Sequence, residues 1–297
     1  MGKAAPVVRG EEDEEEPDPG TGGPVRIDPE NGRDIPESDK VLLSGTMHNL
    51  THAPAYRKVE GMQPVIGNYL NKLIDRMESD ITGYKASAIS CKSCDVADIQ
   101  NAIAGSQADP VIIQAGHLNL DSDVTFGSPT KPFVLLVQGM NTNQANAVTI
   151  YGTLIAEHAL NANQGTKLTA AAVGGKYGSV WVGGPVHLNN DSNVTVSDTL
   201  YAGNLTYNNG TLQMNARRVV VEGQMHINTN VEMNISGEMV VGAIVSNNQV
   251  GNLNITGGDL YVRDNVSVNN NLNVTTGGVW AIGSGSAKQE DRHSHAG

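Results

Sequence analysis

Two cysteines three residues apart, Cys91 and Cys94, are the first side chains in the sequence that could carry chemistry. The next residue is Asp95, whereas covalent haem attachment requires a histidine there. The chain contains no other cysteine, so a zinc site would lack two of its usual four ligands. Three interpretations remain for this pair: a structural disulfide, which we favour, two unreactive thiols, or a redox-active pair at a helix start.

Charged side chains between residues 186 and 285 form the second group that could carry chemistry. Glu222 and Asp264 occupy nearly equivalent places in a repeat, and Arg263 stands beside the second. Carboxylates grouped with arginine would suit a polysaccharide lyase or hydrolase, or a glycan-binding groove. Charges that keep a repetitive protein soluble explain the same residues, so we expect no catalytic residue. The chain also lacks a phosphate-binding loop and a calcium-binding repeat signature, and we expect no cofactor and no metal.

A repeat of about 40 residues positions these side chains. Three blocks of 18 residues align without gaps at offsets of 39 and 41 residues: Val186 to Gly203, Met225 to Gly242 and Val266 to Gly283. Each block follows an apolar triplet, respectively 180–182, 219–221 and 260–262. The matching apolar positions are Val186/Met225/Val266, Leu188/Ile227/Val268, Val194/Met233/Val274, Leu200/Met239/Trp280 and Ala202/Val241/Ile282.

The composition of the repeats indicates the architecture. A β-propeller usually shows aromatic signatures, but aromatic residues make up only 4% of this chain. In a solenoid, equivalent side chains of successive coils stack in ladders, where asparagine suits the corners and bonds to its own copy. Stacked lysines would repel, and the chain has none between residues 186 and 285. The sequence therefore predicts an all-β fold, a parallel β-solenoid of about 20-residue coils over residues 109–285.

Two helices are predicted ahead of the solenoid. Apolar residues recur at helical spacing from Gly61 to Tyr84, and Pro64 stands in the first turn. A shorter helix is expected to begin after Asp95 and to end at Gly105. We expect the region 41–108 to form a small helical cap, with the first helix (residues 62–80) covering the first coil.

The two ends of the chain are polar. Residues 1–40 hold 12 acidic and 5 basic side chains, so they supply −7 of the net charge of −12. We expect a disordered acidic tail over residues 1–40 and a polar tail over residues 286–297. The net charge argues against a nucleic-acid partner, and no apolar stretch is long enough for a transmembrane segment.

Two stretches, Asp109 to Gly139 and Val148 to Glu157, resemble Asn- and Gly-rich β-solenoids of bacterial surfaces, including type IV pilus-associated proteins. They are also similar to bactofilins, polymer-forming proteins with short-strand repeats and disordered tails. The likeness covers about 175 residues and lies in the repeat pattern, with no catalytic motif. The insert at residues 140–178 and the helical region depart from bactofilins. Asp98 to Gly116 is similar to the opening of pectin-lyase-like β-helices, which implies polysaccharide cleavage.

We expect a structural, non-enzymatic subunit that assembles head to tail with itself into a filament, surface appendage or surface layer. The reason is the last coil, whose unpaired strand edges invite another subunit. The expected assembly edge consists of Val279, Trp280 and Ile282.

The alternative is a carbohydrate-binding or polysaccharide-cleaving right-handed β-helix of the tail-spike kind. Its glycan site would consist of Glu222, Arg263 and Asp264, and cell-surface components or glycans would be its partners. We expect the aromatic residues at ladder positions to stack in the core, which favours the structural role. Few lysines and many asparagines indicate an extracellular or cell-surface location, whereas the missing signal peptide indicates a cytoplasmic one.

Overall fold

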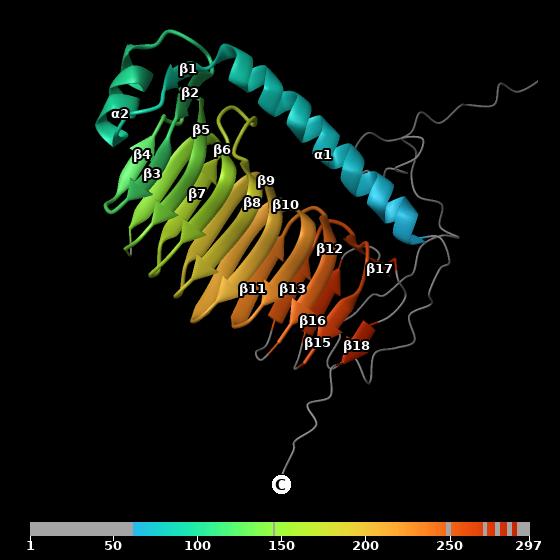
Figure 1. Ribbon diagram of the computed structural model, residues 1–297. Coiled ribbons are helices and arrows are strands. Elements are labelled where there is room, and N and C mark those ends of the chain that lie inside the picture. The colour runs from blue at the N-terminus through green and yellow to red at the C-terminus, as the bar shows by residue number, and fades with distance from the viewer. Residues whose placement is uncertain are drawn as a thin grey trace, which may run out of the picture.

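A computed structural model describes residues 62–144, 146–247, 251–269, 272–276, 280–283 and 287–289. The predicted acidic tail, Val279 and most of the predicted polar tail lie outside these residues, and of Trp280 only the backbone is described. The strands of the described chain form one sheet, whose pairs are parallel, wound into a solenoid of about nine turns (Figure 1). This confirms the predicted fold class of an all-β parallel β-solenoid with about 20-residue coils and an N-terminal helical region.

Two helices, α1 (Met62–Ser87) and α2 (Val96–Gly105), flank the first short strand. The strands are β1 (Ile89–Cys91), β2 (Val111–Ala115), β3 (His117–Leu120), β4 (Val124–Phe126), β5 (Phe133–Thr142), β6 (Ala147–Ala162), β7 (Lys167–Ala171), β8 (Val180–Asn189), β9 (Asn193–Asn208), β10 (Thr211–Ile227), β11 (Asn230–Ile235), β12 (Met239–Ser246), β13 (Gly251–Ile255), β14 (Leu260–Val262), β15 (Val266–Val268), β16 (Leu272–Thr276), β17 (Trp280–Ile282) and β18 (Ala287–Gln289). The sheet therefore extends beyond the predicted range 109–285, because β1 pairs with β2 and β18 pairs with β15.

Each coil presents three flat faces, and the longest strands bend around the corners between them. We call face 1 the stack that begins with β2, face 2 the stack that begins with β3, and face 3 the stack that begins with β4. Strand β9 contributes to all three, since it pairs with β7 on face 3 and with two parts of β8 on faces 1 and 2. Glycine occurs where neighbouring coils approach closely at a corner: a Cβ at Gly184 would lie 1.8 Å from the carbonyl oxygen of His158.

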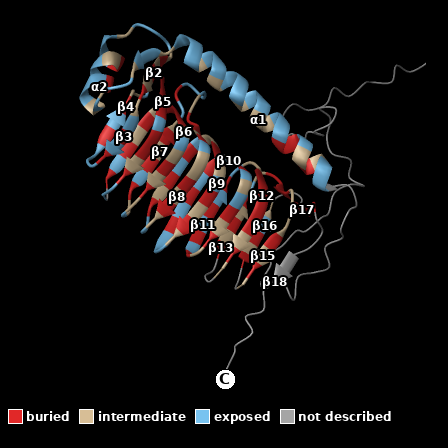
Figure 2. Cartoon of the chain, viewed as in Figure 1, coloured by how far each residue is buried: buried red, intermediate tan, exposed pale blue. Residues whose placement is uncertain are grey.

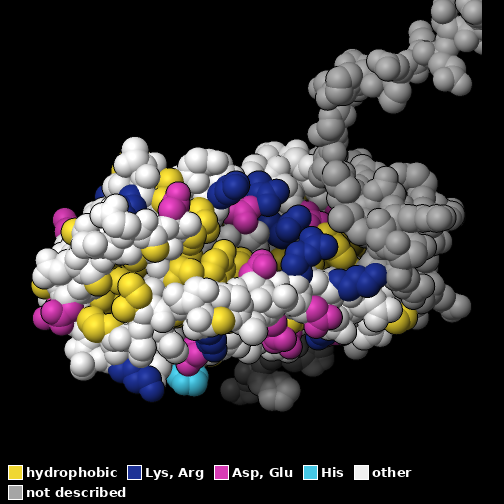
Figure 3. Space-filling model, turned by 90° about the horizontal axis from the view of Figure 1, so that it is seen from above, with side chains coloured by type: hydrophobic (Ala, Val, Ile, Leu, Met, Phe, Trp, Pro, Cys, Tyr) yellow, Lys and Arg dark blue, Asp and Glu magenta, His cyan; other side chains and the backbone are white. Residues whose placement is uncertain are grey.

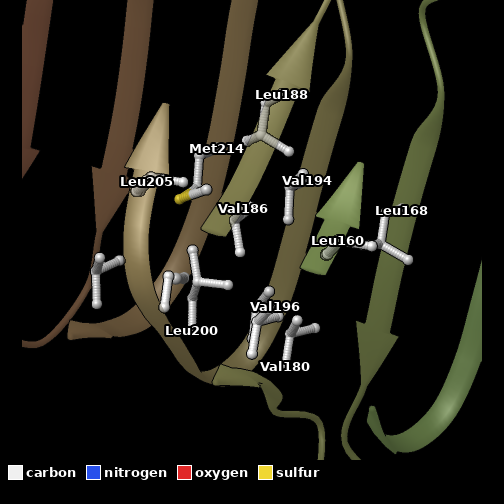
Figure 4. Packing of buried hydrophobic residues seen from close by; sticks show 14 of the residues in the cluster. Leu160, Leu168, Val180, Val186, Leu188, Val194, Val196, Leu200, Leu205 and Met214 are labelled. Carbon is white, nitrogen blue, oxygen red and sulfur yellow. The ribbon is translucent and has the colours of Figure 1, made fainter. Parts of the chain in front are cut away.

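The inside of the solenoid is filled by apolar ladders. On face 2 the stacking order is Val186, Leu205, Met225, Ile244 and Val266, all of them buried. Figure 4 shows side chains of adjacent coils pointing into this common interior. The predicted equivalence of Val186, Met225 and Val266 is thus confirmed, and one repeat of about 40 residues corresponds to two coils.

Asparagine side chains form the expected hydrogen-bonded ladder along one corner. The amides of Asn247, Asn228, Asn208 and Asn189 each donate to the side-chain oxygen of the asparagine in the preceding coil, ending at Asn163, over distances of 2.8–3.2 Å. A partly buried amide that both donates and accepts along the stack leaves few polar atoms unpaired. The asparagine content is therefore a consequence of parallel stacking.

Helix α2, not α1, closes the N-terminal end of the core. Its buried residues Ile99 and Ile103 join the interior cluster, and the Gln100 side chain donates to the Thr125 carbonyl of β4 over 3.1 Å. The helix begins with a capping box between Asp95 and Asp98, as the spacing predicted.

Helix α1 runs along the outside of the solenoid, against face 1 (Figure 1). Our expectation that residues 62–80 cover the first coil is therefore wrong. Its apolar stripe contacts face 1 from the last coil to the first, and its other side is exposed (Figure 2). The spacing of the apolar residues predicted the helix, but that spacing does not specify which surface the apolar stripe covers.

Replacing Leu70 with alanine should lower the free energy of unfolding by about 2–4 kcal/mol, because this α1 side chain is fully buried against face 1. Urea denaturation checks the change, and limited proteolysis should show faster cleavage within α1. The neighbouring exposed residue supplies the control, since Asn71→Ala should change stability by less than about 0.5 kcal/mol. Equal stability of both variants would contradict the packing of α1 on face 1.

Replacing Asn208 with aspartate should destabilise the protein by about 1–3 kcal/mol near neutral pH, because a carboxylate cannot donate to Asn189. The penalty should shrink in acid, where a protonated carboxyl can donate again. Denaturation at several pH values measures both effects. Asn68→Asp, at an exposed position on α1, is the matched control. If the asparagine ladder did not contribute to stability, the two variants would have the same free energy of unfolding.

Candidate functional site

The interface between α1 and face 1 includes the three residues of the alternative glycan site, Glu222, Arg263 and Asp264. Residues of face 1 whose side chains point outward form a second apolar ladder: Leu136, Ile155, Trp181, Tyr201, Val220, Val240, Tyr261 and Ala281. Triplets such as 219–221 are consequently buried throughout, with the outer residues in the interior and the middle one under α1. The expectation that the aromatic ladder residues stack in the core holds for Tyr207 but is wrong for Trp181, Tyr201 and Tyr261, which lie on the side of face 1 that α1 covers.

The length of α1 matches the stack that it covers. Its 26 residues span about 39 Å at 1.5 Å per residue. Nine coils at a strand spacing of about 4.8 Å extend over about 38 Å. The helix therefore contacts face 1 near Ala281 with its first turns and near Val134 with its last turns.

Tyrosine hydroxyls under α1 are paired with carboxylates. Tyr69 of α1 donates to both carboxylate oxygens of Glu238, over 2.8 and 2.9 Å, and the Arg218 Nε lies 2.7 Å from Glu238 Oε1. Tyr201 donates to Glu222 over 2.8 Å, and Tyr261 donates to Asp259 over 2.7 Å. The tyrosine rings thus stay buried while each hydroxyl keeps a strong acceptor.

Of the three residues of the alternative glycan site, Arg263 and Asp264 lie side by side at the start of α1, whereas Glu222 lies two coils away. Arg263 forms an ion pair with Asp264 over 2.8 Å, and Gln63 of α1 donates to Asp264 over 2.9 Å. The hydrogen bond to Asp264, and then the negative charges of Asp264 and Glu222, raise the pKa of the Arg263 guanidinium, while burial acts in the opposite direction. Hydrogen bonds from Arg263 and Gln63 hold the pKa of Asp264 below its usual range. Asp264 is therefore engaged with Arg263 and with the start of α1, while Glu222 accepts a hydrogen bond from Tyr201.

The paired cysteines lie beside the first coil. Cys91 ends β1, and the structure joins it to Cys94 by a disulfide immediately before α2. Both side chains are partly buried against the interior cluster. The disulfide links β1, which covers the edge of β2, to α2, which closes the core. Its role in this position is structural.

The two ends of the solenoid differ. At the C-terminal end, within the described chain, β16, β17 and β18 each pair with a strand on one side only. Of the predicted assembly edge, Ile282 is 3% exposed and belongs to the interior cluster, while the Trp280 backbone pairs with Leu260. The edge is therefore backbone, with the side chain of Ile282 facing the core.

The chain matches no protein-family model, no curated protein and no solved structure. The sequence resemblances to bactofilins and pectin-lyase-like β-helices are supported only as far as the solenoid architecture. In the described part of the chain, no group of three or more His, Cys, Asp or Glu side chains could hold a metal ion. Neither described helix is long and apolar enough to span a membrane.

The contact of Tyr69 on α1 with Glu238 and Arg218 on the solenoid was not predicted from the sequence. A signal was present, since triplets with three apolar residues in a row indicate strands buried on both sides. An alternating strand of an exposed face would instead show a polar middle residue. The apolar triplets thus indicated that another element covers the outside of these strands. They did not indicate which segment of the chain forms that element.

Stability should decline as the pH rises above about 10, the pKa of an exposed tyrosine. Burial, and then the neighbouring carboxylate, raises the pKa of Tyr69, Tyr201 and Tyr261 in the folded protein. This contribution is fully present below the unfolded pKa and is lost as the pH rises toward the folded values. Urea denaturation at increasing alkaline pH measures the slope. Replacing the three tyrosines with phenylalanine should flatten it, and Tyr151→Phe, on face 3, is the control.

Thiol titration tests the disulfide. The unfolded, unreduced protein should show no reactive thiol, and reduction should release two, since the chain has two cysteines. Cys91→Ser with Cys94→Ser should then lower stability, because β1 and α2 lose their link. Two thiols before reduction would contradict the structural disulfide.

Proposed function

We propose that this protein is a structural, non-enzymatic β-solenoid subunit that assembles end to end with copies of itself. The assemblies we propose are a filament, a surface appendage or a surface layer. The observation that carries the proposal is a difference between the two ends within the described residues: β1 and α2 cover part of the first coil, whereas β16 and β17 each pair on one side only.

Backbone polarity makes the C-terminal coil a template for pairing. In the described coils, N–H groups of inward-facing residues donate to the following coil, as Val219 does to Glu238 and Met239 to Asp259. Outward-facing residues donate to the preceding coil, as Thr256 does to Ile235. By the same alternation, inward-facing residues of β16 direct their N–H groups at the open end. Such a row of donors and acceptors invites a further strand.

The N-terminal coil is less open. The edge of β2 is paired with β1, and α2 lies over β4, whereas β3 pairs on one side only within the described residues. Head-to-tail addition, the mode expected from the sequence, would therefore use β3 or require α2 to move. Contact between two C-terminal coils requires neither, and it would give a closed dimer.

The engaged carboxylates support a non-enzymatic role. Glu222, Glu238 and Asp264 accept hydrogen bonds from α1 or from face 1, which accounts for their positions without a reaction. An extracellular or cell-surface location is part of the proposal, because a disulfide between Cys91 and Cys94 forms most readily in an oxidising compartment.

Analytical ultracentrifugation over a wide concentration range, together with electron microscopy, tests the proposal. The purified chain should form dimers or longer particles as the concentration rises. Asn273→Lys with Thr275→Lys, on β16, should suppress them because charges at a strand edge oppose pairing. Monodisperse monomers at every concentration would reject self-assembly.

The mode of assembly can be separated with a second variant. Asn119 faces outward on β3, so its N–H is directed at the open N-terminal edge, and Asn119→Pro removes that donor. Head-to-tail growth should be lost in Asn119→Pro, whereas contact between two C-terminal coils should persist. Unchanged thermal unfolding of each variant is the control for folding.

A further inference from the structure

A cleft opens where α1 and face 1 separate. The helix is tightly packed near Ile66 and Leu70, but further along Leu73 and Met77 are only partly buried. A cavity of about 140 Å³ lies there between α1 and strands β8, β9 and β10. On the face shown in Figure 3, hydrophobic side chains lie beside Lys and Arg side chains and several Asp and Glu side chains.

The lining combines an aromatic and aliphatic wall with charges of both signs. Trp181 and Val220 of face 1, together with Leu73 and Met77 of α1, supply the apolar part. The remaining residues are polar, namely Arg76 and Asp80 from α1 and Asp198, Thr199, Tyr201 and Arg218 from face 1. Each side of the cleft therefore contributes one guanidinium and one carboxylate.

The groups on the solenoid side are held in place. Asp198 accepts hydrogen bonds from Ser179 over 3.0 Å and from Thr199 over 3.3 Å, and it forms an ion pair with Arg217. Arg218 is paired with Glu238, while its buried Nε has no hydrogen-bond partner of suitable direction in the described chain. Side chains fixed in this way lose little conformational freedom when a ligand binds.

The lining restricts the chemistry of a ligand. An anion would approach Asp80 and Asp198, and a cation would approach Arg76 and Arg218, so either would meet a like charge. A purely apolar ligand would cover charged groups without replacing their hydrogen bonds to water. A neutral ring with one apolar side and several hydroxyl groups fits this lining. Its apolar side can pack against the aromatic wall, while its hydroxyl groups donate to the carboxylates and accept from the guanidinium groups.

The size of the cleft agrees with a single ring. Engineered cavities of about 150 Å³ hold one benzene ring. A pyranose with its hydroxyl groups is larger, and because this cleft is open to solvent, one part of the sugar would enter it while the rest stays outside. We propose that this cleft binds one neutral pyranose unit of a glycan against Trp181, with hydroxyl groups bonded to Asp198, Arg218 and the helix residues Arg76 and Asp80. This inference does not depend on self-assembly, and it concerns a different place from Glu222, Arg263 and Asp264.

Fluorescence titration tests the site directly, because the chain contains only two tryptophans. In a Trp280→Phe background, Trp181 is the sole tryptophan, and the probes are the methyl glycosides of glucose, galactose, mannose and N-acetylglucosamine. At least one should change the emission in a saturable manner. The charged sugars glucuronate and glucosamine should bind at least tenfold more weakly, since each meets a like charge in the cleft.

Variants on the exposed helix locate the binding. The double variant Arg76→Ala with Asp80→Ala should raise the Kd of that glycoside at least tenfold, because hydrogen bonds to charged groups are lost. Lys72→Ala with Asp75→Ala, on the solvent side of α1, should leave the Kd unchanged. If Trp280→Phe fails to fold, a glycoside-dependent rise of the Tm in the unaltered chain replaces the fluorescence readout.

Three results would overturn the inference. The first is the absence of a saturable response to every neutral glycoside. The second is an equal effect of the Arg76/Asp80 and Lys72/Asp75 variants on the Kd. The third is preferential binding of glucuronate or glucosamine, which would assign the cleft to a charged ligand.

Discussion

Parallel stacking of coils is the constraint on which the rest of this structure depends. Each strand pairs with the equivalent strand of the next coil, so a residue at one position is surrounded by its own copies above and below. Side chains that attract their own copies are retained, as in the ladder from Asn163 to Asn247, where each amide donates to the asparagine of the preceding coil. Copies that repel are excluded, which accounts for the absence of lysine between residues 186 and 285.

The second apolar ladder, on the outside of face 1, follows from the same stacking and explains α1. A row of eight outward-facing residues from Leu136 to Ala281 would leave an extended apolar stripe in water. Helix α1 removes that stripe from water, and the carboxylates of Glu222, Glu238 and Asp259 accept the tyrosine hydroxyls of the interface. The interface is loosest at Leu73 and Met77, where the cleft beside Trp181 remains.

Stacking also creates the problem of the ends. The apolar interior and the strand edges of a solenoid are exposed at each end unless another element covers them. The two ends of this solenoid differ in that respect. At the first coil, Ile99 and Ile103 of α2 complete the core and Cys91–Cys94 ties the covering strand to that helix. At the last described coil, backbone groups of β16 and β17 have a partner strand on one side only. The proposed assembly uses this asymmetry.

The repeats in the sequence were sufficient to predict the coil length, the interior ladders at Val186, Met225 and Val266 and the asparagine ladder, because these features depend on stacking of equivalent residues. Both helices were predictable from the spacing of apolar residues ahead of the repeats, since that spacing is a local property of the chain. The sequence also placed Glu222 and Asp264 at nearly equivalent positions one repeat apart, which is a distance of two coils in the structure. It did not reveal that α1 lies along face 1, that α2 closes the core, or that Tyr201 and Tyr261 face outward. Those arrangements join residues as far apart as Gln63 and Asp264, and a period shared by many segments does not specify which surfaces meet. Only the tertiary structure, in which segments distant in the sequence pack against one another, decided them.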